Sequence, residues 1–153
     1  MKIRSYREND AIPTLSLFRQ TVKIVNSADY SVNQIKVWSG RKIDIQVWNE
    51  SLLANTALVV CDDHDTIIGF ADMNISGYLD RLFVSYRCQH RGCATLLIHE
   101  LQRQVVVKRY YAFVSITAKS FFESQGFRVV KENTVIIEKV KFRNYLMEKR
   151  VVN

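Results

Sequence analysis

Hydrophobic residues follow two spacings along this chain, one typical of helices and one typical of strands. Apolar positions three and four residues apart predict amphipathic helices, whereas short runs rich in valine, isoleucine, leucine and phenylalanine predict strands. The predicted strands cover residues 2–6, 56–61, 66–73, 78–84, 111–117, 128–130 with 135–140, and 144–149. The predicted helices cover residues 10–25, 31–38, 92–107 and 118–125.

The order of these elements predicts the fold class. Residues 56–61 and 66–73 flank the polar sequence DDHD as an expected β-hairpin, and a strand, a helix and another strand follow. We therefore expect an α/β (α+β) fold. It is a single domain over residues 1–153, with a mixed, mostly antiparallel central sheet of about six to seven strands and helices on both faces. A ligand would bind beyond the carboxyl end of strand 78–84, at the N-terminus of helix 92–107.

Composition argues against several classes of protein. No apolar run approaches the ~20 residues of a membrane span, and the N-terminal MKIRSYREND lacks the apolar core of a signal peptide. Cys61, Cys88 and Cys93 lack CxxC spacing, so we expect neither structural disulfides nor a zinc site. The acidic run DDHD suits a turn better than a metal site. We therefore expect a cytoplasmic protein with no membrane partner and no bound metal.

The net charge of +7 is concentrated toward the C-terminal end of the sequence. Residues 101–153 hold eleven lysines and arginines against four acidic residues. Such a segment can meet a nucleic acid or an anionic cofactor, although a solvated basic surface is the commoner interpretation. We therefore expect no nucleic-acid partner, while a macromolecular acceptor stays open as an alternative.

The sequence QHRGCATLL, residues 89–97, places a glycine and an alanine at the start of a predicted helix. The first N–H groups of a helix have no partner within the helix, and the helix dipole makes that end positive. A pyrophosphate satisfies both conditions, and Gly92 and Ala94 leave the backbone bare enough for its close approach. The alternative is a glycine that merely starts a helix packed tightly on a strand.

This stretch and its surroundings resemble the GNAT superfamily of acyl-CoA N-acyltransferases, in which a strand precedes Gln/Arg-x-x-Gly-x-Gly/Ala and a helix. Here LFV (82–84) precedes QHRGCA (89–94). Further along, FESQGF (122–127) is similar to the family's Tyr-Glu-x-x-Gly-Phe. The opening IRSYRENDA also resembles such domains, and TVKIVNSADYSVNQIKVW resembles the helical region of a bacterial subgroup of acetyltransferases.

The resemblance implies that acetyl-CoA or coenzyme A is the cofactor. The amides of residues 89–95 would then grip its pyrophosphate, with charge added by His90 and Arg91 and a hydroxyl by Thr95. Pantetheine would pair with the main chain at Leu82–Val84. The implied cofactor-binding residues are Leu82, Phe83, Val84, Gln89, His90, Arg91, Gly92, Cys93, Ala94, Thr95, Ser115 and Phe122.

The resemblance also implies a reaction, the direct attack of an amine on the acetyl thioester in a ternary complex. A lysine-like amine has a pKa of ~10.4 and is almost entirely protonated at neutral pH, so a general base helps. Asp80 is the candidate base, because strand alternation places it on the face of Leu82 and Val84. The alternative is a strand carboxylate that pairs with an arginine such as Arg81 or Arg4.

Two positions depart from the family pattern. Phe122 stands where many members carry a tyrosine that protonates the leaving thiolate, and Ser115 stands where many carry an asparagine. A thiol of pKa ~8.5 leaves adequately as an anion, so activity is still expected. Tyr145 is the preferred replacement acid among several tyrosines and water, although packing on the core is the commoner role for such a residue.

The acceptor site is implied in the same way. Tyr30 and Trp38 lie in the helical region that covers the acceptor groove in this family and could cage an ammonium, although both could be core residues instead. Tyr78 lies two residues before Asp80 on the same strand face, where some relatives carry the base.

We therefore expect an N-acetyltransferase that acetylates a primary amine of a small molecule. One alternative is an acceptor that is a macromolecule, either a protein amine or an aminoacyl-tRNA. Another is a non-catalytic acyl-CoA-binding module, which Phe122 and Ser115 leave open. A homodimer is a further expectation, because terminal strands pair between subunits in relatives.

Overall fold

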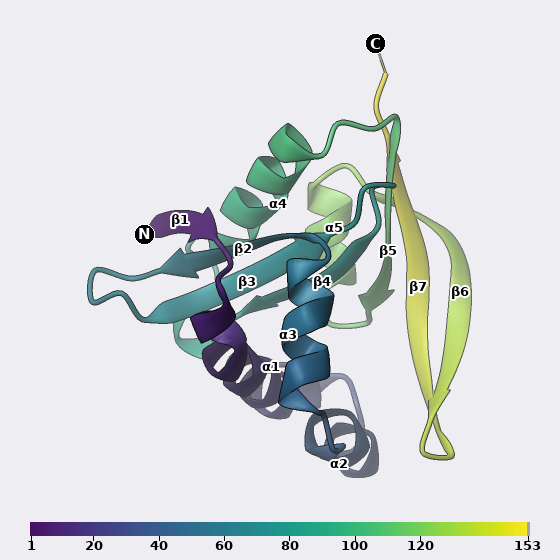
Figure 1. Cartoon of the computed structure of the whole chain (residues 1–153). Coiled ribbons are helices and arrows are strands. Elements are labelled where there is room, and N and C mark those ends of the chain that lie inside the picture. Colours follow the sequence, from purple (N-terminus) through teal and green to yellow (C-terminus); the bar gives the residue numbers. More distant parts are fainter. Residues whose placement is uncertain (153) are drawn as a thin grey trace.

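Seven strands form two sheets in residues 1–152, the part of the chain that the computed structural model describes (Figure 1). The first sheet has the order β1-β2-β3-β4 and the second the order β5-β7-β6, and neighbours within each sheet are antiparallel. The strands are β1 (Lys2–Ser5), β2 (Thr56–Cys61), β3 (Ile67–Met73), β4 (Leu79–Val84), β5 (Arg109–Ser115), β6 (Arg128–Ile137) and β7 (Val140–Arg150).

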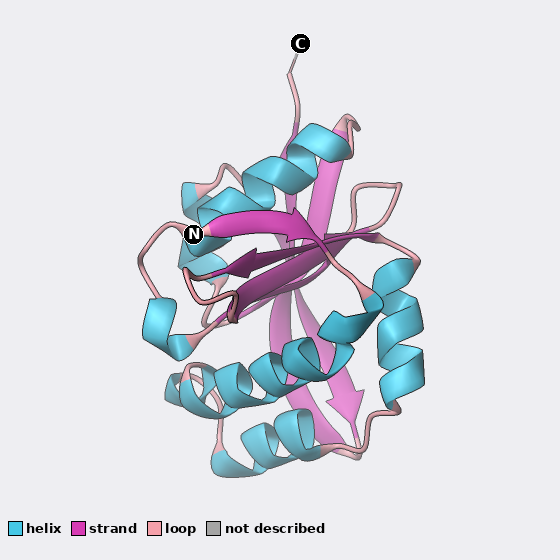
Figure 2. Ribbon diagram, turned by 60° about the vertical axis from the view of Figure 1, so that its left-hand side comes forward, coloured by secondary structure: helices cyan, strands magenta, loops and turns pink. Residues whose placement is uncertain are grey.

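Helices cover both faces of the first sheet. Figure 1 shows α4 on one face and α1 and α3 on the other, and Figure 2 shows the same layers from the side. α2 packs on α1 and on β7, and so connects the helical layer to the second sheet. The helices are α1 (Ala11–Ile24), α2 (Val32–Gly40), α3 (Ile45–Leu53), α4 (Cys93–Gln104) and α5 (Lys119–Ser124).

Two apolar cores form because β2 and β3 send alternate side chains to the two helical layers. Leu58 and Val60 of β2 pack toward α4 with Leu97. Val59 of the same strand packs toward α1 and α3 with Trp48. The sequence of β2 is therefore a nearly continuous apolar run, as expected for a strand buried on both faces.

Within residues 1–152, one isolated β-bridge joins the two sheets. Tyr78, just before β4, bridges to Tyr111 of β5 in the parallel sense, and the Tyr111 N–H donates to the Gly77 carbonyl at 3.1 Å. Beyond that bridge the two strands belong to different sheets, so among the described residues β4 and β5 separate toward their carboxyl ends. The predicted parallel strand–helix–strand unit is thus present, and it opens beside the first turn of α4.

The predicted fold class is confirmed, with one change in the sheet. The sequence predicted one central sheet, whereas the structure divides the strands between two. Hydrophobic spacing reports which residues are buried but not which strands pair, because pairing of distant strands depends on the whole chain. The division matters because it leaves space between β4 and β5.

One helix, α3, was not predicted. Asp44 caps it by accepting hydrogen bonds from the N–H groups of Gln46 at 2.8 Å and Val47 at 3.3 Å, and Trp48 is buried on its inner side. Apolar residues also occupy its outer side, where Val47 is 61% exposed. The helical periodicity is therefore blurred in the sequence, although the Asp44 cap was a readable start.

Element boundaries also differ from the prediction in the C-terminal half. The strand expected over residues 128–130 with 135–140 is continuous as β6 and ends at Ile137, and β7 begins at Val140 after a two-residue turn, earlier than the expected residue 144. Glu138 and Lys139 make this turn with left-handed φ values of 47° and 65°. The helix predicted over residues 92–107 ends at Gln104, because three successive β-branched valines follow it.

Candidate functional site

Two pockets meet where β4 and β5 separate. The α4 pocket, about 670 Å³, lies between the end of β4, the first turn of α4, and α5. The α2 pocket, about 460 Å³, lies between α2, α3, β4 and β7. Leu82 and Phe83 of β4, Ser115 of β5 and Ala118 line both pockets. A group held in one pocket can therefore reach a group held in the other.

The first turn of α4 presents bare N–H groups to the α4 pocket. Gly92 is the N-cap residue with a left-handed φ of 83°, and no described side chain caps the helix. A Cβ at Gly92 would meet nothing within 4 Å, so glycine is required here by its conformation rather than by crowding. The uncapped N–H groups and the positive helix end suit a phosphate group.

Contacts behind this turn hold it against the first sheet. A Cβ added at Gly69 of β3 would lie 2.6 Å from Cys93 Sγ, so the glycine makes room for the helix. Cys93 is buried there, and burial raises the pKa of its thiol to about 11. Gln89 Nε2 donates to the Val84 carbonyl at 2.7 Å, which ties the loop before α4 to the end of β4.

The remaining wall of the α4 pocket contains hydroxyl and amide side chains, and no acidic residue among the described residues belongs to it. Thr117 Oγ1 is buried there without a hydrogen-bond partner. Thr95 Oγ1 accepts a hydrogen bond from Gln125 Nε2 at 3.3 Å, and Ser120 and Ser124 add hydroxyl groups. A ligand with phosphate groups would meet no opposing charge from this lining.

Ten of the twelve residues predicted to bind the cofactor line the α4 pocket. The exceptions are Arg91, whose exposed side chain lies outside the lining, and Phe122, which lines the α2 pocket instead. Thr117 and Gln125 belong to the lining but were not predicted. Thr117 belongs to no quoted sequence pattern, and Gln125 occupies a variable position of FESQGF (122–127), so only the packing of α5 beside α4 reveals them.

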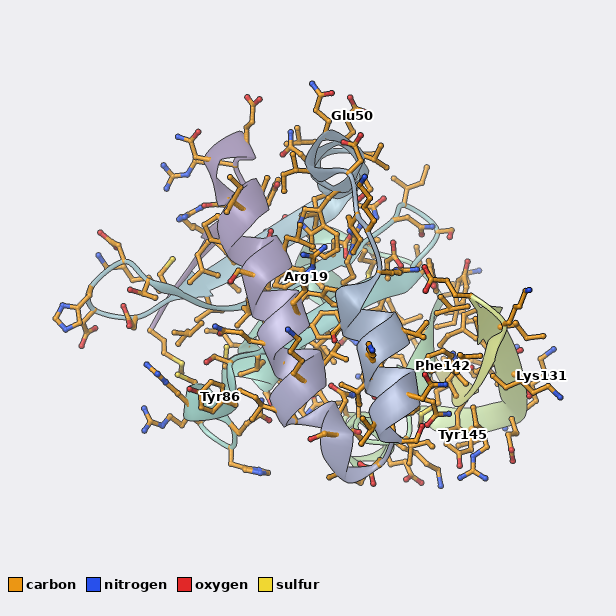
Figure 3. All side chains as sticks on the ribbon, turned by 90° about the horizontal axis from the view of Figure 1, so that it is seen from below. Arg19, Glu50, Tyr86, Lys131, Phe142 and Tyr145 are labelled. Carbon is orange, nitrogen blue, oxygen red and sulfur yellow. The ribbon has the colours of Figure 1, made fainter. Side chains whose placement is uncertain are left out.

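Aromatic side chains form much of the α2 pocket. The rings of Tyr30 and Trp38 meet edge to face with centroids 5.3 Å apart, and Phe142 packs against both at 6.3 and 6.2 Å. Figure 3 shows Phe142 on the β6–β7 hairpin beside α2. The two predicted acceptor residues, Tyr30 and Trp38, therefore lie together in the pocket wall.

The hydroxyl of Tyr30 is engaged by the backbone. It accepts a hydrogen bond from the Ile116 N–H at 3.0 Å and donates one to the Arg143 carbonyl at 3.1 Å. Burial raises the pKa of Tyr30, so the hydroxyl stays neutral. Tyr30 thereby links the segment before α2 to the end of β5 and to β7.

A buried ion pair forms another part of the α2 pocket wall. Arg81 Nε and Nη2 donate to the two carboxylate oxygens of Asp72 at 3.0 and 2.8 Å. Arg81 Nη1 donates to Ser51 Oγ at 3.0 Å, and the guanidinium lies 4.9 Å from the centroid of the Trp48 ring. Burial raises the pKa of the Asp72 carboxyl, and the Arg81 charge opposes that rise. These contacts hold Arg81 in one position beside Asp80.

Asp80, the predicted base, lies at the edge of the α2 pocket. Its side chain is 42% exposed, and its Oδ2 accepts a hydrogen bond from Arg81 Nη2 at 3.4 Å. Arg4, the other suggested partner, pairs with Asp10 at 2.7 Å instead. Asp80 thus has both an accessible carboxylate and an arginine neighbour, which leaves the base and the ion-pair interpretations open.

The predicted alternation along β4 is wrong at its start. A register shift between Asp72 and Met73 of β3 lies opposite this region. Leu79, rather than Asp80, consequently joins Leu82 and Val84 in the core against α4. A bulge of this kind reverses the face of the residues beyond it, and period-two reasoning cannot detect it.

Tyr145, the predicted acid, lines neither pocket. Its register partner on β5 is Val114, and it packs against the core under α5, where Lys119 Nζ lies 5.2 Å from the ring centroid. The neighbouring β7 residues Phe142 and Asn144 line the α2 pocket instead, because alternate residues of a strand point to opposite faces.

Tyr78, the third predicted acceptor residue, also lies outside both pockets. Its ring packs on that of Tyr111 with centroids 5.2 Å apart, at the point where the two sheets join. Burial raises the pKa of Tyr78 to about 12. A tyrosine with this pKa keeps its proton near neutral pH and does not act as a base there.

Two further features concern metals and membranes. Among the described residues, no group of three or more histidine, cysteine, aspartate or glutamate side chains could hold a metal ion. No helix within the same residues has the length and apolar character needed to cross a membrane.

The α4 pocket ends at bare helix amides and meets an aromatic pocket where β4 and β5 separate, so the fold offers two adjoining places for ligands. Residues 26–149 match the family model of the acetyltransferase (GNAT) domain. The chain is also 33% identical over 147 residues to YafP, an uncharacterised N-acetyltransferase of Escherichia coli strain K12, and the match covers 96% of this chain and 94% of that protein. The chain therefore belongs to the GNAT acetyltransferase family.

Solved structures share the same fold. A GCN5-related N-acetyltransferase from Rhodopseudomonas palustris matches with a TM-score of 0.91 and 24% identity, over 98% of this chain and 95% of that one. The PaiA N-acetyltransferase from Thermoplasma acidophilum, in complex with coenzyme A, matches with a TM-score of 0.82 and 19% identity, over 98% of each chain. At these identities the similarity concerns the arrangement of the chain.

Proposed function

We propose that this GNAT acetyltransferase moves an acetyl group from acetyl-CoA to a primary amine of a small molecule, by direct attack in a ternary complex. The observation that carries the proposal is the meeting of the α4 and α2 pockets at Leu82, Phe83 and Ser115. Two ligands can reach each other there without leaving the protein. Holding reactants in this way contributes much of the rate in such reactions.

In this proposal the α4 pocket holds coenzyme A. The N–H groups of Cys93, Ala94 and Thr95 would bind the diphosphate, and the main chain of β4 at Leu82 would pair with pantetheine. The left-handed Gly92, the uncapped helix and the lack of acidic lining residues support this assignment. The complex of PaiA with coenzyme A, in a protein of the same fold, agrees with it.

The α2 pocket would hold the acceptor amine beside Asp80. Asp80, acting directly or through water, would remove a proton from the ammonium, and the neutral nitrogen would then bond to the thioester carbonyl carbon as the carbon–sulfur bond breaks. The sulfur would leave as a thiolate, and the second proton, which the nitrogen loses as the amide forms, would reach this thiolate through water. Phe122, at 4% exposure, offers an apolar wall and no proton.

The size of the α2 pocket favours a small acceptor over a macromolecule. Its volume of about 460 Å³ falls within the ~300–1,000 Å³ usual for small-molecule pockets. The predicted homodimer stays a prediction. It would use β6, the outer strand of its sheet, where Val129 and Ile136 are exposed.

Release of coenzyme A thiol from acetyl-CoA tests this proposal. The purified protein is incubated with a panel of small primary amines, with peptides that have free amino groups, and with aminoacyl-tRNA. We expect thiol release and an acetylated product with small amines. Acetylation of the peptides or the tRNA alone would contradict the small-molecule assignment, and tight acetyl-CoA binding without transfer to any amine would favour a binding module.

A further inference from the structure

The charges around the α2 pocket are not evenly balanced. Four charged residues line it, Arg41, Asp80, Arg81 and Arg143. Arg81 is bound to the buried carboxylate of Asp72 by two hydrogen bonds, so its charge is already compensated. The charges of Arg41, Asp80 and Arg143 therefore determine the electrostatic environment of an acceptor in this pocket.

Arg143 directs its charge away from this pocket. Its Nε lies 3.7 Å from Glu132 Oε1. Glu132 is the register partner of Tyr145, which packs on the opposite face of the sheet from Phe142 and Asn144. The carbonyl of Arg143 is bound by Tyr30, so this residue contributes backbone rather than charge.

Arg41 is different. It follows α2 as the C-cap residue, and no described acidic side chain pairs with its exposed guanidinium. Arg19 of α1 adds positive charge at the same loop, because its Nη2 donates to the Arg41 carbonyl at 3.3 Å and its Nε is buried without a partner. Figure 3 shows Arg19 between α1 and α2. The lining of the α2 pocket therefore includes Arg41, whose charge has no acidic partner among the described residues, and Asp80 of β4.

We propose, on the basis of the function proposed above, that the acceptor is an aromatic amine that also carries a carboxylate, and that Arg41 binds this carboxylate. Asp80 attracts the ammonium, Arg41 attracts the carboxylate, and the rings of Tyr30, Trp38 and Phe142 cover the apolar body. A guanidinium binds a carboxylate with two parallel hydrogen bonds. This gives selectivity for amines that carry a carboxylate over amines that carry none. Arg41 is then a specificity-determining residue.

Matched acceptors test this inference. L-Phenylalanine and its methyl ester have the same aromatic body and the same amine, and only the former has a carboxylate. We expect Arg41→Gln to lower the ratio of kcat/KM values, phenylalanine over ester, by about tenfold to hundredfold relative to the wild type, as for loss of a charged hydrogen bond. Comparing this ratio between variants cancels the different basicity of the two amines. Arg41→Lys keeps the positive charge and should lower the ratio less than Arg41→Gln does.

Two controls separate this inference from the function on which it rests. Lys42→Gln, at an exposed position outside both pocket linings, removes the same charge from the neighbouring residue and should leave the ratio unchanged. Calorimetry of L-phenylalanine binding to the coenzyme A-loaded protein provides a readout without turnover, and Arg41→Gln should weaken this binding by a similar factor.

The outcomes are distinguishable. Equal ratios in the wild type and Arg41→Gln, with both amines acetylated, would overturn the carboxylate assignment and leave the proposed function standing. If neither amine is acetylated, although phenylalanine binds in a way that depends on Arg41, the proposed function is contradicted instead. Acetylation of peptides or tRNA alone, with no binding of phenylalanine, would overturn both.

Discussion

At the scale of single residues, Gly92 offers the most direct test of the proposed cofactor site. Gly92→Gln and Gly92→Glu impose the same strain on a φ of 83°, but only glutamate places a carboxylate at the uncapped helix end. We expect the glutamate variant to bind acetyl-CoA at least about tenfold more weakly than the glutamine variant, because the carboxylate repels the diphosphate. Isothermal calorimetry measures both affinities. Equal affinities would show that the diphosphate binds elsewhere.

Asp80 is the second residue whose role can be isolated. Asp80→Asn keeps the shape of the side chain and removes the base. We expect turnover to fall, by up to about 10²–10⁴-fold, with the largest deficit at low pH, where fewer acceptor amines are neutral. Near pH 9 the deficit should shrink, since more of the amine needs no base. Steady-state rates across pH 6–9 measure this effect, and a constant deficit would remove Asp80 as the base.

The tyrosines show that a sequence can indicate large amphipathic residues without indicating which of them line a pocket. Tyr30, Tyr78 and Tyr145 were all predicted to serve the site, yet only Tyr30 lines the α2 pocket. Tyr78 supports the junction of the sheets, and Tyr145 packs under α5. A single sequence identifies such residues as large and amphipathic, but their orientation depends on strand register.

At the scale of elements, Tyr30 connects a helical segment to two strands. Tyr30→Phe removes the hydroxyl and leaves the Ile116 N–H and the Arg143 carbonyl without this partner. We expect the free energy of unfolding to fall by about 1–3 kcal/mol, because buried polar groups lose their hydrogen bonds. Urea denaturation measures the loss. The exposed tyrosine variant Tyr86→Phe should change stability by less than about 0.5 kcal/mol, and equal losses would contradict the linking role.

Glu148 of β7 connects all three strands of the second sheet. Hydrogen bonds from Arg109 of β5, then from Arg128 of β6 and Arg150 of β7, lower the pKa of Glu148 from 4.5 to about 2. A carboxyl with a lowered pKa in the folded state stabilises the protein above the unfolded-state value, and this contribution is lost as pH falls from 4.5 toward 2.

The variant Glu148→Gln tests this pH dependence. We expect it to be less stable than the wild type at pH 7, and we expect the difference to shrink as the pH falls toward 2, where the wild-type carboxyl is also protonated. Urea denaturation at pH 7 and pH 3 compares the two proteins. Glu123→Gln, at an exposed residue without an ion pair among the described residues, serves as the control. A difference that grows at low pH would contradict the assignment.

These contacts also bear on the basic C-terminal part of the sequence. Three of its arginines converge on Glu148, so part of the positive charge stabilises the second sheet. Composition alone did not reveal this, because the three arginines are distant in the sequence and meet only through strand pairing.

At the scale of the whole molecule, the α4 pocket lies between elements of both sheets, so a bound cofactor should stabilise the entire fold. A ligand at a hundredfold its Kd adds about 2.7 kcal/mol of stability. For a domain of this size we expect acetyl-CoA at that concentration to raise Tm by about 5–10 °C. Differential scanning fluorimetry measures the shift. Gly92→Glu at the same ligand concentration should show a smaller shift, and an equal one would place the cofactor outside the α4 pocket.

The local sequence determined most of the segments that form strands and helices, and where the helix with the bare N-terminus begins. The apolar runs of β2 and β3, the stripe of α4 and the bare glycine before it could be read directly, because burial and helix termini impose their requirements on neighbouring residues. The resemblance carried by residues 82–94 and 122–127 indicated the family, and the family match confirmed it. Ten of the residues predicted from that resemblance line one pocket.

The tertiary structure decided the rest. Strand pairing divided the sheet between β4 and β5, a bulge reversed the start of β4, and register turned Tyr145 away from the pocket. The acceptor side combines α2, the unpredicted α3, β4 and β7, and Trp38 of α2 lies more than a hundred positions before Asn144 of β7. Local patterns determine which residues are buried, whereas the contents of a pocket depend on contacts between distant segments, and one-residue shifts in register change them.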